Sequence, residues 1–305
     1  MSPDILYYDQ GTVADEAALR FLRSMLGDSK GHLRLVYITE KPSEVLDERR
    51  RDLAQEQRSK QNRSEAEEAL AKARKIVGDI RIELETMDIE GDPVREVNRL
   101  LVEKGGGGYD LLILRAYGRG VFSKDILGAH AKSLVQHATS PILIHKGQLD
   151  SCEKVLIHVP AESQRCLEFI RYMANLLGGA HPAVTFLAVF DEEHKRFEGY
   201  TSAEEKKLEE ALEHYDRKDV KYLEEARKIM NEAGFEVEIR RRTGDLTEEI
   251  LNEARSGRYD LLAFAPEEPG LLMSLWQGDE SFEIMRDVEI SVLKFPREFH
   301  FSGLD

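Results

Sequence analysis

The stretch Tyr109-Asp110-Leu111-Leu112-Ile113-Leu114 returns 150 residues later as Tyr259-Asp260-Leu261-Leu262-Ala263-Phe264. Two further matches, each separated by 153 residues, are Ala73-Arg74-Lys75-Ile76 with Ala226-Arg227-Lys228-Ile229 and Gly91-Asp92 with Gly244-Asp245. Three matched segments in one order indicate that the chain is an internal duplication. Each copy therefore serves as a control for the other, because a site motif kept in one copy and lost in the other shows which half can use it.

The repeat divides the chain of 305 residues into two halves of ordinary domain size. We predict domains at residues 1–148 and 149–305, joined near Gln148-Leu149-Asp150-Ser151. Because this connection is short, we expect the halves to pack on each other.

Composition limits the classes of function. The net charge of −15 resides in the second half, since residues 1–148 hold 23 basic and 24 acidic residues. Neither half has the basic excess of a duplex-binding protein. The sequence has no window resembling a membrane span and begins without a signal-like segment, so we expect a cytoplasmic protein. Cys152 and Cys166 are too few for a disulfide framework and are interpreted as ordinary reduced thiols.

Apolar runs alternate with amphipathic stretches along the first half. The expected strands are 5–9, 32–38, 81–89, 110–114 and 141–145, and the expected helices are 12–26, most of 41–77, 93–104 and 123–137. Thr12 with Asp15 resembles a capping box, Gly27 closes the first helix, and Pro93 fits a first helical position.

The second half repeats the series. Its expected strands are 154–159, 184–189, 235–241, 260–264 and 290–295, and its expected helices are 163–177, 204–233 and 247–254. Continuous apolar strands between helices predict a parallel sheet covered on both faces. The expected fold class is α/β, with two tandem, doubly wound, five-stranded parallel sheets of Rossmann-like type.

The order of elements, the Gly91-Asp92-Pro93 turn and the loop Arg115-Ala116-Tyr117-Gly118-Arg119-Gly120 leading to Leu127-Gly128 resemble the universal stress protein family. Because the repeat keeps the order, the resemblance extends over the chain as a tandem pair. ATP-binding members of that family carry a glycine, two residues, a second glycine, nine residues, a third glycine and then Ser or Thr. Here Gly118 and Gly128 keep two of these four positions, whereas Arg115 and Ala129 replace the first glycine and the hydroxyl residue.

The resemblance implies a nucleotide site in the first half only. Glycines after a strand allow backbone N–H groups to approach a phosphate, and the next helix presents its positive end. Arg115 interferes with that approach but brings a charge able to hold a phosphate. Asp9 is implied to contact the nucleoside, and Tyr37 or Ile38 to pack on adenine. The complete predicted set is Asp9, Tyr37, Ile38, Arg115, Gly118, Arg119, Gly120, Gly128, Ala129 and His130, with ATP or AMP as the ligand and no metal beyond accompanying Mg²⁺.

The second copy lacks these features. Residues 265–280 hold four acidic side chains and no basic one, and Pro266-Glu267-Glu268-Pro269 replaces the glycine loop. The apolar run Leu271–Trp276 is interpreted as core or as a plug for a lost pocket. Asp9 aligns by sequence with Pro160, which offers no carboxylate.

Other interpretations stay open. The glycines are also consistent with a plain strand-to-helix connection, and Asp9 with a turn or cap. His130, His137 and His145 do not have metal-ligand spacing, because two lie seven apart on one helix and the third in another element. The charged stretch 48–63 is a solvated helix face by default, with partner contact as the alternative.

Three functions follow from these residues. The first is a non-enzymatic stress-response regulator or adaptor with an adenine nucleotide in the first half and no catalytic residue. The second is an ATP-using enzyme, although neither a His-x-Gly-His nor a Ser-Gly-Gly-x-Asp-Ser motif occurs. The third is a structural scaffold whose paired halves form a homodimer through edge strands such as Pro141–His145 and Ile290–Phe295.

Overall fold

The structure is a computed structural model that describes most of both halves. The described residues are 2–9, 13–40, 64–89, 93–103, 108–116, 134–135, 139–147, 149–159, 164–190, 221–264 and 280–296. The charged stretch 48–63 and the apolar run Leu271–Trp276 therefore lie outside the described residues.

The first half follows the predicted order. Its elements are β1 (Asp4–Asp9), α1 (Val13–Leu26), β2 (His32–Glu40), β3 (Arg81–Ile89), α3 (Pro93–Glu103), β4 (Leu111–Arg115) and β5 (Ile142–His145). Residues 64–77 are helical, which confirms the end of the long polar helix. The chain closes α1 with Gly27 at φ +54°, the left-handed conformation expected after a helix.

The second half has the same order of elements, with α8 between its last two strands. Its elements are β6 (Lys154–His158), α5 (Gln164–Leu177), β7 (Ala183–Phe190), β8 (Val237–Thr243), α7 (Leu246–Ser256), β9 (Leu261–Phe264), α8 (Glu280–Asp287) and β10 (Ser291–Lys294). The sequence analysis did not predict α8. Asp245 caps α7, and its carboxylate accepts a hydrogen bond from the Glu248 amide.

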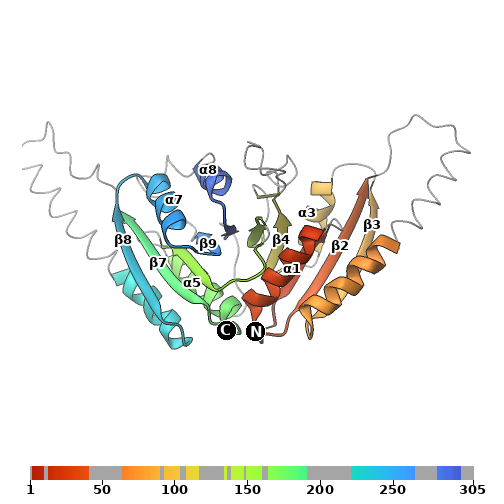
Figure 1. Ribbon diagram of the computed structural model, residues 1–305, viewed down its shortest axis with the longest axis horizontal. Helices are drawn as coiled ribbons and strands as arrows, with labels where there is room; N and C mark the ends of the chain where they lie inside the picture. Colours follow the sequence, from red (N-terminus) through yellow and green to blue (C-terminus); the bar gives the residue numbers. More distant parts are fainter. Residues whose placement is uncertain are drawn as a thin grey trace, which may run out of the picture.

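All ten strands form one sheet, in the order β3-β2-β1-β4-β5-β10-β9-β6-β7-β8. Within each half the strands are parallel and doubly wound, which confirms the predicted fold class. At the centre β5 and β10 pair antiparallel, and Figure 1 shows the two halves related across this line. The expectation that these two strands are edges for a homodimer is wrong, because each completes the other within one chain.

The repeated Tyr-Asp motif holds the start of each half's first strand. The Asp110 carboxylate accepts a hydrogen bond from the Asp4 amide at 2.8 Å, and the Asp110 amide donates to the Asp4 carbonyl. In the second half, the Asp260 carboxylate accepts from the Lys154 amide at 2.9 Å, and the Asp260 amide donates to the Lys154 carbonyl. The duplication therefore preserved a framework contact at the amino ends of the strands.

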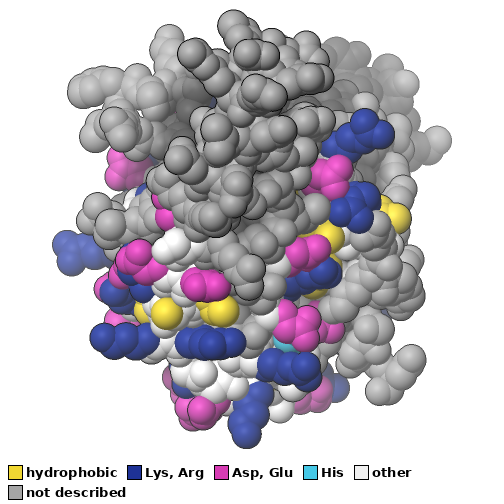
Figure 2. Space-filling model, turned by 90° about the vertical axis from the view of Figure 1, so that its right-hand side faces the viewer, with side chains coloured by type: hydrophobic (Ala, Val, Ile, Leu, Met, Phe, Trp, Pro, Cys, Tyr) yellow, Lys and Arg dark blue, Asp and Glu magenta, His cyan; other side chains and the backbone are white. Residues whose placement is uncertain are grey.

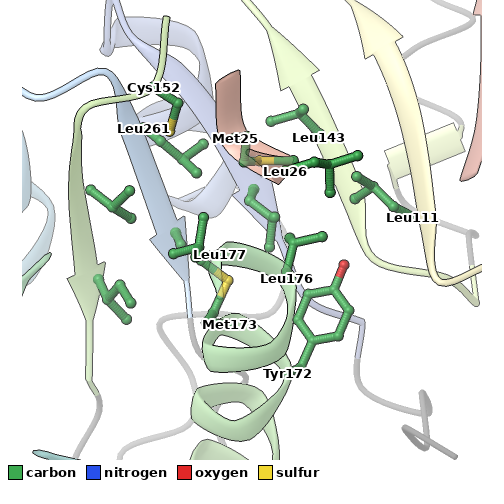
Figure 3. Close-up of a cluster of buried hydrophobic side chains, with 14 of the residues drawn as sticks. Met25, Leu26, Leu111, Leu143, Cys152, Tyr172, Met173, Leu176, Leu177 and Leu261 are labelled. Carbon is green, nitrogen blue, oxygen red and sulfur yellow. The ribbon is translucent and has the colours of Figure 1, made fainter. Parts of the chain in front are cut away.

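Two apolar clusters cover the two faces of the sheet, and each contains residues from both halves. One lies under α1, α5 and the helical residues 64–77 and 221–232, and the other lies under α3, α7 and α8. Figure 3 shows the first cluster where Met25 and Leu26 of α1 meet Met173 and Leu176 of α5. The halves therefore share their cores, and the domain division at residue 148 stays a prediction.

The ends of α1 and α5 cross with their backbones in contact. The Asp28 amide donates to the Gly179 carbonyl at 3.1 Å. A Cβ on Gly179 would lie 2.2 Å from the Leu26 carbonyl oxygen, and one on Gly27 would lie 2.2 Å from the Gly179 oxygen. Glycine is required at this crossing because no side chain fits between the two backbone segments.

The outer side of the first half carries both signs of charge. Figure 2 shows basic and acidic side chains interspersed over the described part of this face. Salt bridges such as Lys72 with Glu68 and Arg81 with Glu83 join neighbouring charges there. This distribution agrees with the nearly neutral charge count of residues 1–148.

Candidate functional site

The strand order reverses between β1 and β4, where ligands bind in doubly wound sheets. The ladder between these strands contains three residue pairs, from Ile5 opposite Leu111 to Tyr7 opposite Ile113. It stops two residues before either strand ends, at Asp9 and Arg115. The carboxyl ends of the two strands therefore carry groups that are not used to pair β1 with β4.

The structure brings together part of the predicted nucleotide set. Asp9 lies opposite Tyr37 in the register of β1 and β2, and Ile38 follows it in β2. Their backbones are described and their side chains are not. Six further predicted residues lie outside the described residues: Gly118, Arg119, Gly120, Gly128, Ala129 and His130.

Arg115 is the predicted site residue whose side chain the structure describes. It ends β4 opposite His145 of β5, and the side chains of both residues lie on the α1 face of the sheet. Arg115 is half-buried, and its Nη1 atom is buried with no hydrogen-bond partner among the described residues. A buried guanidinium N–H without an acceptor is costly, and it suits an anionic oxygen.

His145 lies fully buried beside this arginine. Its Nε2 lies 2.7 Å from the Leu149 carbonyl oxygen, and its ring packs edge-on against Phe21 with centroids 5.3 Å apart. Burial lowers the pKa of His145, and the Arg115 charge lowers it further against the opposing hydrogen bond and the Asp15 carboxylate. The ring is therefore neutral at pH 7, and its Nε2–H donates to Leu149.

Asp15 completes a buried polar group under the start of α1. The Tyr7 hydroxyl donates to its Oδ1 at 2.7 Å, and Asp15 is only 2% exposed. The sequence analysis assigned Asp15 to a capping box and missed Tyr7 and His145 altogether. Tyr7 lies two residues before Asp9, so strand alternation, which places both on one face, was the signal that pointed to it.

The second half is built differently at the equivalent point. The ladder between β6 and β9 contains four pairs and runs to His158 opposite Phe264, one pair further than the ladder between β1 and β4. His158 is buried, which lowers its pKa to about 4. The registers place Val159, one residue before the predicted Pro160, at the position of Asp9, so a carboxylate is still lacking there.

A buried carboxylate in the second half is bound on several sides and is structural. Glu253 is fully buried and accepts hydrogen bonds from Arg240 at 2.7 Å, Arg242 at 2.6 Å and the Tyr259 hydroxyl at 3.0 Å. Burial alone would raise the pKa of Glu253, but the bonds from Arg242 and Tyr259 and the charge of Arg240 outweigh it and lower the pKa. Glu253 is therefore ionised and paired.

The remaining predictions concern metals, thiols and membranes. Among the described residues no group of three His, Cys, Asp or Glu side chains is arranged to hold a metal ion, and two of the three histidines considered, His130 and His137, lie outside them. Cys152 and Cys166 are buried free thiols, and burial raises the pKa of Cys166 to about 12. The described part of the chain contains no helix with the length and apolar character of a membrane span.

Comparison with known proteins places this geometry in a family. The universal stress protein family model matches residues 1–146. A universal stress protein from Archaeoglobus fulgidus DSM 4304 has 15% sequence identity and a TM-score of 0.63, with 97% of each chain covered. A functionally unknown protein from Pseudomonas aeruginosa PAO1 has 16% identity and a TM-score of 0.55, with 96% of this chain and 92% of its own covered.

One shorter relative was solved with a ligand. It is a universal stress protein in complex with cAMP, 14% identical, which covers 48% of this chain and 97% of its own with a TM-score of 0.34. That ligand is a property of that protein. No curated protein matches this sequence. Residues 1–146 match the universal stress protein family, and over 97% of its length the chain has the fold of a solved universal stress protein.

Proposed function

We propose that this chain is a non-enzymatic, cytoplasmic regulator or adaptor of the stress response that binds one adenine nucleotide, ATP or AMP, in residues 1–148. The observation that carries the proposal is the difference between the two reversal points of the sheet. In the first half the ladder stops at Tyr7 and Ile113, two residues before Asp9 and Arg115, and in the second half it continues one pair further, to His158 and Phe264. Residues 149–305 then form a partner domain without a nucleotide.

Each proposed contact follows from the chemistry of the residue. The Asp9 carboxylate accepts hydrogen bonds from the ribose hydroxyls, and Tyr37 or Ile38 packs on the adenine ring. The buried Arg115 Nη1 donates to a phosphate oxygen, which supplies the acceptor that this atom lacks among the described residues. The loop containing Gly118, Arg119, Gly120, Gly128, Ala129 and His130 surrounds the phosphates, and Mg²⁺ enters only together with ATP.

Isothermal titration of ATP, AMP and cAMP into the purified chain tests the proposal. We expect one site per chain, with affinity reduced about tenfold or more in Asp9→Asn and Arg115→Met, since each loses a hydrogen bond to or from a charged group. Arg81→Met is the matched control, because Arg81 is an exposed arginine at the opposite end of the sheet. No heat of binding at millimolar nucleotide, or equal affinity in all variants, would remove the nucleotide from the proposed function.

A scaffold without ligand is the second candidate, and the continuous ten-stranded sheet favours it. A homodimer would then have to use a surface other than β5 and β10, which pair within the chain. Light scattering of the purified protein checks the assembly state. A dimer together with no nucleotide heat supports the scaffold, and one nucleotide per chain excludes it.

A further inference from the structure

A lysine of the first half caps a helix of the second half across the β5–β10 pair. Lys146 follows β5 directly, and its amide donates to the Ser291 hydroxyl of β10 at 3.3 Å. Its Nζ donates to the Met285 carbonyl and, at 2.6 Å, to the Val288 carbonyl. These carbonyls lie in the last turn of α8 and just after it, where the helix exposes its negative end.

The ammonium group of Lys146 is held without a carboxylate in contact. Lys146 is 4% exposed, and no carboxylate among the described residues lies within 4 Å of its Nζ. Burial lowers the pKa of Lys146 to about 8, although Asp287 and Glu289 oppose the shift. Asp287 itself is bound by Arg286 at 2.6 Å, so its charge is already paired.

The other charged or titratable groups near the last turn of α8 have partners other than the Lys146 ammonium group. The hydrogen bond from Arg286 lowers the pKa of Asp287, and the charges of Arg255 in α7 and of Lys146 lower it further. His145, the neighbour of Lys146 in sequence, lies on the opposite face of the sheet against Phe21 of α1. The carbonyls of α8 are therefore the direct partners of the buried ammonium in the described structure.

The second half supplies a related contact from a different position of the repeat, since Lys294 corresponds to Ile144 and not to Lys146. The Nζ of Lys294 in β10 donates to the Val135 carbonyl at 2.9 Å. Val135 and Met285 are equivalent residues of the repeat, 150 positions apart. The side chain of Lys294 is half-buried, whereas Lys146 is buried. Each half thus supplies a lysine to a backbone carbonyl of a helical residue in the other half, and of these two lysines only Lys146 is buried.

We infer that the last turn of α8 is a proton-coupled latch, which detaches from the β5–β10 pair only when Lys146 enters water and carries a proton there. The inference does not depend on nucleotide binding. Detached Lys146 has the ordinary pKa of 10.5, and the buried group has about 8. Between these pH values the open form, with Lys146 in water, carries a proton that the closed form, with Lys146 buried, lacks. The equilibrium constant for opening therefore falls by up to tenfold for each unit of rise in pH.

Amide hydrogen exchange tests the latch in the full-length protein. The amides of residues 284–288 include the Val288 N–H, which donates to the Ile284 carbonyl. After correction for the intrinsic rate, we expect their protection to rise by up to tenfold per pH unit between about pH 8 and 10 and to be nearly constant below pH 7. Lys146→Met should remove this slope, and Lys294→Met is the matched control that should keep it. The same slope in Lys146→Met, or none in the wild type, overturns the inference.

A second measurement needs no variant. NMR of the wild-type protein with ¹⁵N-labelled lysine side chains should show one Nζ resonance that titrates near pH 8 and whose midpoint is separate from those of the exposed lysines. Protonated Lys146 should also exchange its Nζ protons slowly because it is buried. Titration of every lysine near pH 10.5 would contradict the latch, even if Lys146→Met does not fold.

Discussion

Tyr109 and Tyr259 occupy the same place in the two halves, yet their hydroxyls meet opposite charges. Arg34 of β2 donates to the Tyr109 hydroxyl at 2.8 Å and also forms an ion pair with Glu85 of β3. In the second half the Tyr259 hydroxyl donates to Glu253 of α7, which Arg240 and Arg242 of β8 also bind. The backbone framework was kept, and the charges around it were exchanged.

The strand registers identify the exchanged positions. Arg34 corresponds to Thr185 and Glu85 to Arg240, while the helix repeat aligns Leu100 with Glu253. A cation moved from the second strand to the third, and a buried leucine became a carboxylate. Such a change is tolerated only when all members change together, since one misplaced charge in this position would be buried without a partner.

The largest expected effect comes from removing both cations of Glu253. Arg240→Met with Arg242→Met leaves a fully buried carboxylate uncompensated, and we expect the free energy of unfolding to fall by about 3–5 kcal/mol. Adding Glu253→Leu, the residue that the first half has at this position, should restore most of the loss. Urea unfolding measures both steps, with Arg241→Met, a change at the exposed neighbour, as control. If the triple variant were no more stable than the double, the charges would not form one unit.

An intermediate effect is expected where the two halves touch backbone to backbone. In Gly179→Ala the new methyl group lies against the Leu26 carbonyl, and separating α1 from α5 should cost about 1–3 kcal/mol of unfolding free energy. Gly178→Ala is the control, because its nearest atom belongs to its own helix turn at 3.0 Å. Thermal and urea unfolding of both variants checks this, and equal stability would show that the crossing adapts.

The smallest effect is the difference between the losses that the same change causes at the two tyrosines. Tyr259→Phe removes a bond to a buried carboxylate and should cost about 1.5–3 kcal/mol. Tyr109→Phe should cost about 0.5–1 kcal/mol, because Arg34 is partly exposed and keeps its ion pair with Glu85. Urea unfolding of the two variants gives the difference. Equal losses would mean that the two surroundings are energetically alike despite their different charges.

The sequence predicted the repeat, the element order and the parallel halves because apolar strands and glycine turns are local signals. It missed α8, since Glu280–Asp287 is eight residues long and too short to show a clear helical period. It predicted that the halves pack on each other but missed the pairing of β5 with β10, because these strands have the same apolar character whether they are edges or neighbours. Their pairing depends on how two distant segments meet in space.

The candidate site was predictable only in part, for a similar reason. Parallel strands bring their carboxyl ends to one edge, so the adjacency of Asp9 and Tyr37 followed from the fold class. The surroundings of Arg115 did not, because they depend on its register with His145 in β5 and on the position of α1 above both. The buried lysine at α8 required the antiparallel pairing and could not be read from either half alone.

The antiparallel join of β5 and β10 also has a consequence for assembly. If β5 and β10 belonged to two separate chains, the fraction of paired chains would depend on their concentration, and the chains could exchange partners. Here the covalent connection makes the join independent of dilution, and each half always meets the same neighbour. A fixed neighbour lets one half specialise without passing its changes to the other, which a pair of identical chains can never do.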